Sequence, residues 1–206
     1  MFPFDVVLFD VGGVLLTNGW GRHERAAVLA QFNLDYGAFE ARHAAPNDAW
    51  ERGKISKDEY LDATVFYEPR SFTHEDFFAA ICAQSQPLPS GALGILQEIS
   101  ASNRCLVGGL SNEAHEVNEY RLERFGLRSY FQVFFSSSYL GLRKPEAAIY
   151  RCVLDVLGRP AKRVLFIDER EENVDAAREA AMQAICFAGA EALRPALEDM
   201  GVLEKI

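Results

Sequence analysis

Short apolar runs recur along the chain, and each is nearly continuous instead of alternating with polar residues. Such runs are typical of strands that are covered on both faces of a parallel sheet. Amphipathic stretches of helix length lie between the later runs, at 113–125, 145–157 and 172–182. This alternation predicts an α/β fold with a doubly wound parallel sheet. The apolar runs are FDVVLFDV at 4–11, RCLVGGL at 104–110, QVFFSS at 132–137, RVLFID at 163–168 and QAICFA at 183–188.

The interval from about 18 to 88 breaks the alternation and carries helix-start patterns instead. Ser56 with Glu59, in SKDE, has the spacing of a capping box, and Thr73 with Asp76, in THED, is a weaker version. Apolar residues at helical spacing follow each pattern. The interval is therefore predicted to be a small helical bundle inserted after the first strand.

The turn-rich segment SQPLPSG marks the end of this insertion. We therefore expect a core domain made of residues 1–17 and 89–206, and a cap domain made of residues 18–88. Parallel α/β sheets bind ligands outside the carboxyl ends of their strands. An insertion that follows the first strand is thus expected to lie over the ligand crevice.

The composition narrows the classes of function. Hydrophobic residues make up 49% of the chain, which suits a soluble globular protein with a sizeable core. The formal net charge is −9 and no basic run occurs, so a nucleic-acid partner is not expected. The apolar runs are too short to cross a membrane, and the N-terminus lacks the basic region of a signal peptide. These features predict a cytoplasmic location.

The cysteines and histidines do not have the spacing of metal ligands. The cysteines stand in apolar settings such as YRCVL and AICFA, so buried thiols are expected and a zinc site is not. The cysteines are Cys82, Cys105, Cys152 and Cys186, and the histidines are His23, His43, His74 and His115.

Polar residues stand at the carboxyl ends of the predicted strands. Because these ends meet at one edge of a parallel sheet, their side chains are expected to converge there. Singly, each has an ordinary structural explanation, but a chance arrangement of all of them at one edge is improbable. Capping of a turn or helix would explain Asp10, Ser111 and Asn112, and exposure to solvent would explain Lys144, Asp168 and Glu169.

Together these residue types suit a phosphate site with a cation. A carboxylate at the first strand end can attack phosphorus and also bind Mg²⁺, and Asp168 and Glu169 would complete the metal site. The hydroxyl of Ser111 and nearby backbone N–H groups can hold phosphoryl oxygens, while Lys144 neutralises their charge. Gly12 and Gly13, which follow Asp10, permit a sharp turn close to the ligand.

The segments FDVGGVLL, GGLSN, LRKPEAAIY and LFIDEREENVDAA resemble the four ordered motifs of the haloacid dehalogenase superfamily. The resemblance covers essentially the whole chain and implies a Rossmann-like core with a helical cap. The cap segment ERGKIS is similar to the subgroup of sugar-phosphate phosphatases that includes glucose-1-phosphatase. By this resemblance Asp10 is the nucleophile, Gly12 offers its carbonyl to Mg²⁺, Ser111 and Asn112 bind phosphate, Lys144 orients both, and Asp168 and Glu169 hold the metal.

The chain departs from this pattern at one position. Phosphatases of the superfamily usually read D-x-D, and their second Asp is the general acid and base, but here that position is Gly12. The glucose-1-phosphatase-like subgroup also resembles this chain in having glycine there. General acid–base catalysis contributes about 10²–10⁴-fold, so turnover should be slow or confined to good leaving groups unless another residue substitutes. His23 and His43 are candidates, but a solvated or capping role suits both better.

The 2-haloacid dehalogenases of the same superfamily are the main alternative. They also lack the second Asp, use the first as a nucleophile on carbon without a metal, and have a pattern that Tyr150 fits. They carry small neutral residues, however, where this chain has Asp168 and Glu169. Carboxylates packed near Asp10 repel one another unless a cation lies between them, which favours Mg²⁺ and a phosphatase.

The leading prediction is a Mg²⁺-dependent phosphatase that acts on a small phosphorylated metabolite, such as a sugar phosphate, through an aspartyl-phosphate on Asp10. The alternatives are a metal-independent 2-haloacid dehalogenase and a catalytically weak phosphate-binding or regulatory module. Phe39, Trp50 and Phe66 are candidates to line the pocket or to form the core of the cap. The sequence predicts neither the exact substrate nor the oligomeric state.

Overall fold

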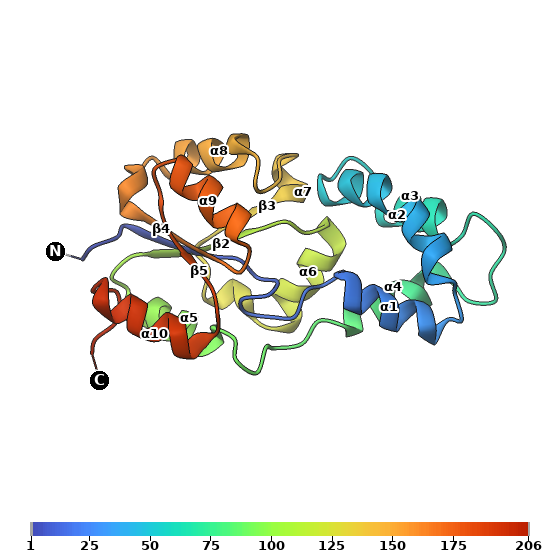
Figure 1. The fold of residues 1–206 in the computed structure, drawn as a ribbon, viewed down its shortest axis with the longest axis horizontal. Coiled ribbons are helices and arrows are strands. Elements are labelled where there is room, and N and C mark those ends of the chain that lie inside the picture. Colours follow the sequence, from blue (N-terminus) through green and yellow to red (C-terminus); the bar gives the residue numbers. More distant parts are fainter. Residues whose placement is uncertain (1, 206) are drawn as a thin grey trace.

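The computed structural model describes residues 2–205 and has two lobes (Figure 1). The larger lobe is built on a five-stranded parallel sheet in the order β3-β2-β1-β4-β5. The predicted α/β fold with a parallel sheet is confirmed, with β1 at its centre. The strands are β1 (Val6–Phe9), β2 (Leu106–Ser111), β3 (Val133–Ser136), β4 (Val164–Asp168) and β5 (Gln183–Cys186).

Helices cover both faces of the sheet, as expected of a doubly wound fold. Val7 and Phe9 belong to one hydrophobic cluster, together with residues of α5 (Leu93–Ser102) and α10 (Ala190–Asp199). Val6 and Leu8 belong to a second cluster, with residues of α8 (Ala147–Leu157) and α9 (Glu171–Glu179). Because successive side chains of a strand point to opposite faces, a continuous apolar strand serves both clusters.

Two further helices of the larger lobe lie near the boundary with the smaller one (Figure 1): α6 (His115–Arg124) follows β2, and the short α7 (Ser137–Leu140) follows β3. Ala114 and Val117, at the start of α6, pack into the hydrophobic cluster of the smaller lobe. The start of α6 therefore forms a hydrophobic contact between the larger lobe and the smaller lobe.

The smaller lobe consists of four helices between β1 and α5. Ser56 caps α3 and Thr73 caps α4, and a capping box is present at both helices, as their spacing predicted. Their own hydrophobic cluster includes Phe39, Trp50 and Tyr60, all buried. The helices are α1 (Arg22–Gln31), α2 (Tyr36–Glu51), α3 (Lys57–Thr64) and α4 (His74–Ala83).

Two chain segments connect the lobes, and they run side by side. The backbone N–H of Thr17 donates to the carbonyl of Gln86 at 2.8 Å, and its hydroxyl donates to the carbonyl of Gln84 at 2.7 Å. This pair of crossings lies close to the expected ends of the cap domain. We keep residues 18–88 as the proposed extent of the cap, and 1–17 with 89–206 as that of the core.

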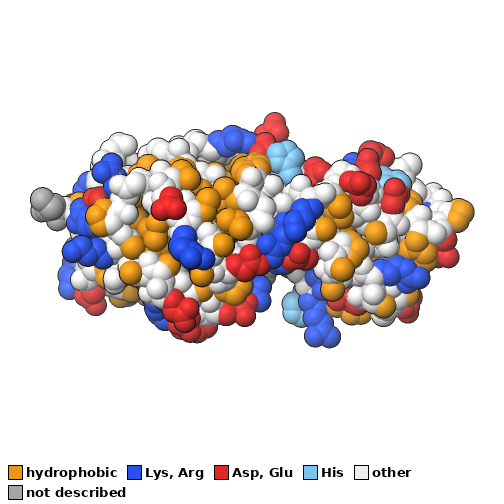
Figure 2. Space-filling model, turned by 90° about the horizontal axis from the view of Figure 1, so that it is seen from above, with side chains coloured by type: hydrophobic (Ala, Val, Ile, Leu, Met, Phe, Trp, Pro, Cys, Tyr) orange, Lys and Arg blue, Asp and Glu red, His pale blue; other side chains and the backbone are white. Residues whose placement is uncertain are grey.

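The surface carries both signs of charge. Figure 2 shows the molecule from above, with a constriction between the two lobes and with acidic and basic side chains interspersed over this face. Neither sign dominates the face, in keeping with a chain that has no basic run. Among residues 2–205, no helix combines the length and the apolar character needed to cross a membrane.

One structural alternative is excluded, and one expectation about side chains is corrected. Asn112 is no helix cap, because α6 begins two residues after Glu113 and its N-cap is Ala114. The expectation of four buried thiols is wrong for three of them, because Cys82 is buried but Cys105, Cys152 and Cys186 are only partly so.

Candidate active site

The register of the three central strands brings the polar strand ends together. Phe9 of β1 pairs with Gly109 of β2 on one side and with Ile167 of β4 on the other. Asp10, one residue further, donates its backbone N–H to the carbonyl of Ile167 at 2.8 Å. Asp10 therefore lies at the same edge as the ends of β2 and β4, as the sequence predicts.

Lys144 lies between two of the carboxylates at this edge. Its Nζ is 2.9 Å from Oδ2 of Asp10 and 2.6 Å from Oδ2 of Asp168, and it donates to the carbonyl of Leu110 at 3.0 Å. The three side chains are almost completely buried, with Asp168 at 0% exposure. Burial alone would lower the pKa of Lys144, but the carboxylates of Asp10 and Asp168 raise it above its usual value. Lys144 is thus a fixed positive charge, not a solvated surface lysine.

The loop that carries Lys144 is held by Asn112, the residue after β2. The side-chain amide of Asn112 donates to the carbonyl of Lys144 at 2.9 Å, and its Oδ1 accepts from the N–H of Lys144 at 2.9 Å. The amide therefore pairs with both backbone groups of one residue. Ser111, the last residue of β2, is buried and lines the cavity next to Asn112.

Asp168 is oriented by the start of the following helix. Its Oδ1 accepts from the backbone N–H of Arg170 at 2.8 Å and from Nδ2 of Asn173 at 2.9 Å. These donors, together with Lys144, fix both carboxylate oxygens, since Asn173 also reaches Oδ2 at 3.0 Å. Asp168 is thus a preorganised buried anion and not the start of a solvated loop.

Glu169 completes a cluster of three carboxylates. Oxygen atoms of Asp10, Asp168 and Glu169 all lie within 4.8 Å of one another. Oε2 of Glu169 is buried and has no hydrogen-bond partner among the described residues. Burial, followed by repulsion from Asp10 and Asp168, raises the pKa of Glu169 to about 8. A buried acceptor without a donor, in a cluster of like charges, is the environment expected where a cation binds.

Gly13 is required by its position against this cluster. Its φ is +73°, and a Cβ atom there would stand 2.6 Å from Cδ of Glu169. Any other residue would be strained and would push the Glu169 carboxylate away. Gly12 has no such constraint on φ, and a Cβ atom there would lie 3.0 Å from Oδ1 of Asn18. Both glycines let the loop after β1 approach the cavity closely.

A cavity of about 490 Å³ opens between the two lobes above the carboxylates. Trp20 is the aromatic residue that lines it, whereas Phe39, Trp50 and Phe66 pack into the hydrophobic cluster of the smaller lobe. The alternative that these three serve the core of the cap is therefore the correct one. The lobes contribute Asp10, Gly12, Ser111, Asn112, Lys144 and Glu169 from one side, and Trp20, Arg25, Asn47 and Glu51 from the other.

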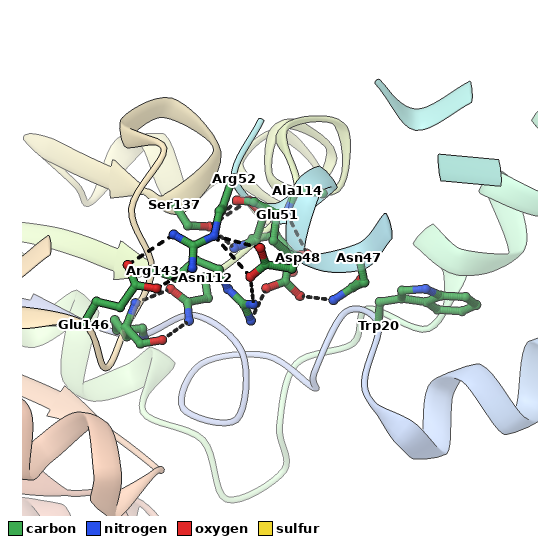
Figure 3. A network of polar contacts seen from close by, with 12 residues as sticks. Trp20, Asn47, Asp48, Glu51, Arg52, Asn112, Ala114, Ser137, Arg143 and Glu146 are labelled. Atoms are coloured by element: carbon green, nitrogen blue, oxygen red, sulfur yellow. Dashed lines mark hydrogen bonds and ion pairs between the residues drawn. The ribbon is translucent and has the colours of Figure 1, made fainter. Parts of the chain in front are cut away.

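Ion pairs join α2 to the loop that carries Lys144 (Figure 3). Nη1 of Arg143 lies 2.7 Å from Oδ1 of Asp48, and Nη2 lies 2.6 Å from Oε2 of Glu51. Arg52, the residue after α2, pairs with Asp48 of that helix and with Glu146 across the boundary. We call Arg143, Asp48, Glu51, Arg52 and Glu146 the cap latch. It ties the smaller lobe directly to the segment next to Lys144.

The histidines do not lie at the cavity. His23 is exposed on α1, and His43 is buried in the smaller lobe with its Nδ1 2.8 Å from the hydroxyl of Tyr60. Glu113 and Arg121, by contrast, do line the cavity, and they were not predicted from the sequence. The signal for Glu113 was its position directly after the GGLSN motif, but a glutamate before a helix is ordinary.

A comparison with protein families matches residues 4–181 to the haloacid dehalogenase-like hydrolases. The chain belongs to this family. The resemblance inferred from the four motifs is therefore confirmed, and this haloacid dehalogenase-like protein is a hydrolase. The sugar-phosphate subtype stays a prediction.

Curated relatives of this hydrolase include two nucleotidases of Escherichia coli (strain K12). Pyrimidine 5'-nucleotidase YjjG is 33% identical over 101 residues, which is 48% of this chain and 44% of that protein. GMP/IMP nucleotidase YrfG is 25% identical over 182 residues, which is 84% of this chain and 78% of that protein. The chain spans between 26% and 65% of the length of the first three curated relatives that it matches.

Among solved structures, the fold is similar to that of haloacid dehalogenase family enzyme BT-2542 from Bacteroides thetaiotaomicron. The TM-score is 0.81 at 21% identity, over 94% of this chain and 98% of that one. Another structure of BT-2542, a complex with magnesium and inorganic phosphate, has a TM-score of 0.73 at 21% identity, over 88% of this chain and 93% of that one. At this identity the likeness establishes the fold of the hydrolase.

Proposed function

We propose that this hydrolase is a Mg²⁺-dependent phosphatase that cleaves a small phosphorylated metabolite through an aspartyl-phosphate on Asp10. The observation that carries the proposal is the meeting of Asp10, Asp168 and Glu169 within 4.8 Å beside the ammonium group of Lys144. The single positive charge of Lys144 does not neutralise three carboxylates, so a second cation would be favoured at this site.

The residues present fit a magnesium ion. Mg²⁺ prefers oxygen ligands and usually takes one or two carboxylates together with phosphate oxygens and water. Asp10 and Asp168 would supply carboxylate oxygens, and the carbonyl of Gly12 a further one. Glu169 would hold the ion directly or through a water molecule with its unpartnered Oε2. The bound ion would neutralise negative charge on the phosphoryl oxygens.

The chain's own residues supply the remaining parts of phosphoryl transfer. Asp10 stands at the central strand end, where its carboxylate can attack phosphorus in line with the leaving oxygen. Ser111 and Asn112 would hold phosphoryl oxygens, and Lys144 would stabilise their charge while it orients Asp10. Asn112 holds the backbone of Lys144, so the phosphate contact and the lysine are fixed as one unit.

The curated relatives support a phosphorylated substrate. YjjG and YrfG are named as nucleotidases, and a structure of BT-2542 holds magnesium with inorganic phosphate. A cavity of about 490 Å³ admits a small molecule, and it exposes an indole ring, amides and charged side chains to the part of the substrate beyond the phosphate. We infer a nucleotide or sugar phosphate as the substrate class. The four cysteines are free, which suits a reducing compartment such as the cytosol.

The proposal is tested by phosphate release from a panel of sugar phosphates, nucleotides and small phosphorylated acids. Activity is expected with Mg²⁺ and loss of activity with EDTA. Asp10→Asn should abolish the Mg²⁺-dependent activity, because the amide does not attack phosphorus. Full activity of this variant would overturn the mechanism.

The dehalogenase alternative rests on Gly12 and predicts chloride release from 2-chloropropionate in the presence of EDTA. The buried cluster of Asp10, Asp168 and Glu169 opposes it, since a metal-free mechanism leaves Oε2 of Glu169 without a partner among like charges. A catalytically weak binding module would instead bind Mg²⁺ and phosphate tightly and hydrolyse no ester of the panel. The same panel therefore separates the three functions.

A further inference from the structure

Gly12, in the loop after β1, has no side chain, and polar atoms of neighbouring residues surround the position that a side chain would occupy. A Cβ atom built on Gly12 would lie 3.0 Å from Oδ1 of Asn18 and 3.6 Å from Nη1 of Arg121. Both residues line the cavity between the lobes. A side chain at position 12 would thus point along the cavity wall toward Asn18 and Arg121.

Arg121 connects this place to a buried carboxylate. Its Nη1, the atom that faces Gly12, donates to Oε2 of Glu113 at 2.8 Å, and its Nη2 donates to the carbonyl of Thr17. Arg121 is 1% exposed and Glu113 is 6% exposed, yet both reach the cavity surface. The guanidinium therefore lies between Gly12 and Glu113, and it holds the carboxyl group of Glu113 at the wall of the cavity that Asp10 and Gly12 also line.

A second glycine, Gly19, lies against the carboxyl group of Glu113. A Cβ atom on Gly19 would stand 2.7 Å from Oε2 of Glu113, so a larger residue there would displace it. Oε1 of Glu113 accepts from the backbone N–H of Ala114 at 3.2 Å. Glu113 is thus fixed by one backbone donor, one guanidinium and the space left by Gly19.

From this geometry, and resting on the proposed phosphatase function, we propose that Glu113 is the general acid and base of this site. Other candidates fit less well. His23 is exposed and His43 lies within the smaller lobe, and neither lines the cavity. Glu51 lines it as well, but its contacts with Asn47 and Arg143 make it part of the cap latch, whereas Glu113 directly follows the two residues proposed to bind phosphate.

The reaction balances with one proton held by Glu113. In the first step a carboxylate oxygen of Asp10 bonds to phosphorus, the ester P–O bond breaks, and the leaving oxygen takes the electron pair and the proton of the Glu113 carboxyl. In the second step the Glu113 carboxylate takes a proton from water as the water oxygen bonds to phosphorus. The bond between Asp10 and phosphorus then breaks, which restores both residues and releases phosphate.

The surroundings of Glu113 allow it to exchange a proton near neutral pH. Burial raises the pKa of Glu113 to about 7, against the opposing effect of Arg121. The other ionisable groups that face it are Glu51 and Asp10, which both raise the pKa further, and the thiol of Cys82. A group with a pKa near the working pH is suited both to donate and to accept a proton.

The test is the dependence of kcat/KM on the leaving group, because kcat/KM reports the steps up to the first transfer. The variant Glu113→Gln keeps the shape and loses the proton. With an alkyl phosphate, whose leaving oxygen needs a proton, kcat/KM should fall about 10²–10⁴-fold. With p-nitrophenyl phosphate, a good leaving group, it should fall less than about tenfold, because acid catalysis is worth little there. Glu119→Gln, at a partly exposed position of α6 that does not line the cavity, is the control and should match the wild-type protein.

A pH profile separates proton transfer from a merely structural role. For the alkyl ester, kcat/KM of the wild-type protein should fall as pH rises above about 7, and Glu113→Gln should lack this limb. If Glu113→Gln does not fold, Glu113→Asp keeps the charge beside Arg121 and should show the same selective loss. The double variant Gly12→Asp, Glu113→Gln should recover part of the alkyl-ester activity.

Several results would overturn the assignment. Equal losses with both esters, no loss with either, or a selective loss in Glu51→Gln but not in Glu113→Gln would each do so. Failure of the proposed function looks different, because the wild-type protein itself would then hydrolyse neither ester in the presence of Mg²⁺.

Discussion

Lys144 places its Nζ atom 2.9 Å from Oδ2 of Asp10, at the carboxyl edge of the sheet. The same atom lies 2.6 Å from Oδ2 of Asp168, so one ammonium group serves two buried carboxylates. A buried ion pair of this kind stabilises little by itself, but the loss of one partner leaves the others buried without compensation. The site is therefore sensitive to any change in its charge balance.

Replacement of the lysine tests this balance. Lys144→Met should lower the free energy of unfolding by about 3–5 kcal/mol when EDTA is present, because two carboxylates lose their cation. Mg²⁺ should restore part of the stability, whereas phosphatase activity should stay reduced by about 10²–10³-fold, since a charge at the phosphate is missing. Denaturant unfolding with and without Mg²⁺ measures the first effect. Lys162→Met, at an exposed lysine, is the control. An unchanged stability of Lys144→Met would show that Lys144 does not compensate the charge of the two carboxylates.

Gly13 separates backbone strain from damage to the carboxylate cluster. Gly13→Ala and Gly158→Ala both place alanine at a positive φ, of +73° and +59°, and each should cost about 1–2 kcal/mol of stability. Only the Cβ atom at position 13 would meet Glu169, because the surroundings of Gly158 are open. Calorimetric titration should therefore show weaker Mg²⁺ binding for Gly13→Ala alone. Equal Mg²⁺ affinities of the two variants would show that Glu169 takes no part in holding the ion.

The cap latch predicts a coupling between the smaller lobe and the loop that carries Lys144. Arg143→Ala removes the pairs with Asp48 and Glu51, so the lobe should close less completely over the substrate. We expect kcat/KM to fall roughly tenfold, which corresponds to about 1.4 kcal/mol. Arg194→Ala, which breaks a surface pair with Glu98 in the larger lobe, is the matched control and should leave the kinetics unchanged. If Arg143→Ala left kcat/KM unchanged, the cap latch would have no part in substrate binding.

His43 gives the stability of the smaller lobe a dependence on pH. Burial, with a smaller effect of Arg25 against that of Glu40, lowers the pKa of His43 to about 4, so the folded protein keeps it neutral. An unfolded histidine has a pKa of about 6.5 and takes up a proton as pH falls. The free energy of unfolding should thus decrease between about pH 6.5 and 4, by at most about 3 kcal/mol.

The variant His43→Gln checks this dependence. Its unfolding free energy should decrease less over the same pH range, because glutamine does not titrate, although it should be lower at pH 7 if the contact with the Tyr60 hydroxyl is lost. Urea unfolding at pH 7 and pH 5 measures the difference. Identical pH slopes of variant and wild type would exclude His43 as the titrating group.

The sequence predicted most of the sheet and the convergence at its edge, for a physical reason. Strands buried on both faces must be apolar throughout, so the polar residue that ends each one stands out, as at Asp10 and Asp168. Parallel pairing then brings the ends together without further information. The capping boxes of Ser56 and Thr73 could be predicted because each depends on two residues that are three positions apart.

Contacts between segments that are distant along the chain could not be predicted from the sequence. The structure pairs Asn112 with the backbone of Lys144, where the sequence offered a local helix cap as the simpler explanation. Trp20 reaches the cavity, while Phe39 and Trp50 do not, because apolar spacing on a helix is the same for a core and for a pocket. The approach of Arg121 to Gly12 depends on how the loop after β1 folds back, and no spacing along the chain encodes it.

The most direct test of the proposed mechanism is the detection of phosphate on Asp10 during turnover. The protein is mixed with its best ester from the panel and Mg²⁺, quenched, reduced with borohydride and analysed by peptide mass spectrometry. We expect the reduction product of an aspartyl-phosphate at Asp10 with Mg²⁺, and none with EDTA. Turnover of the ester without modification of Asp10 under these conditions would contradict the mechanism.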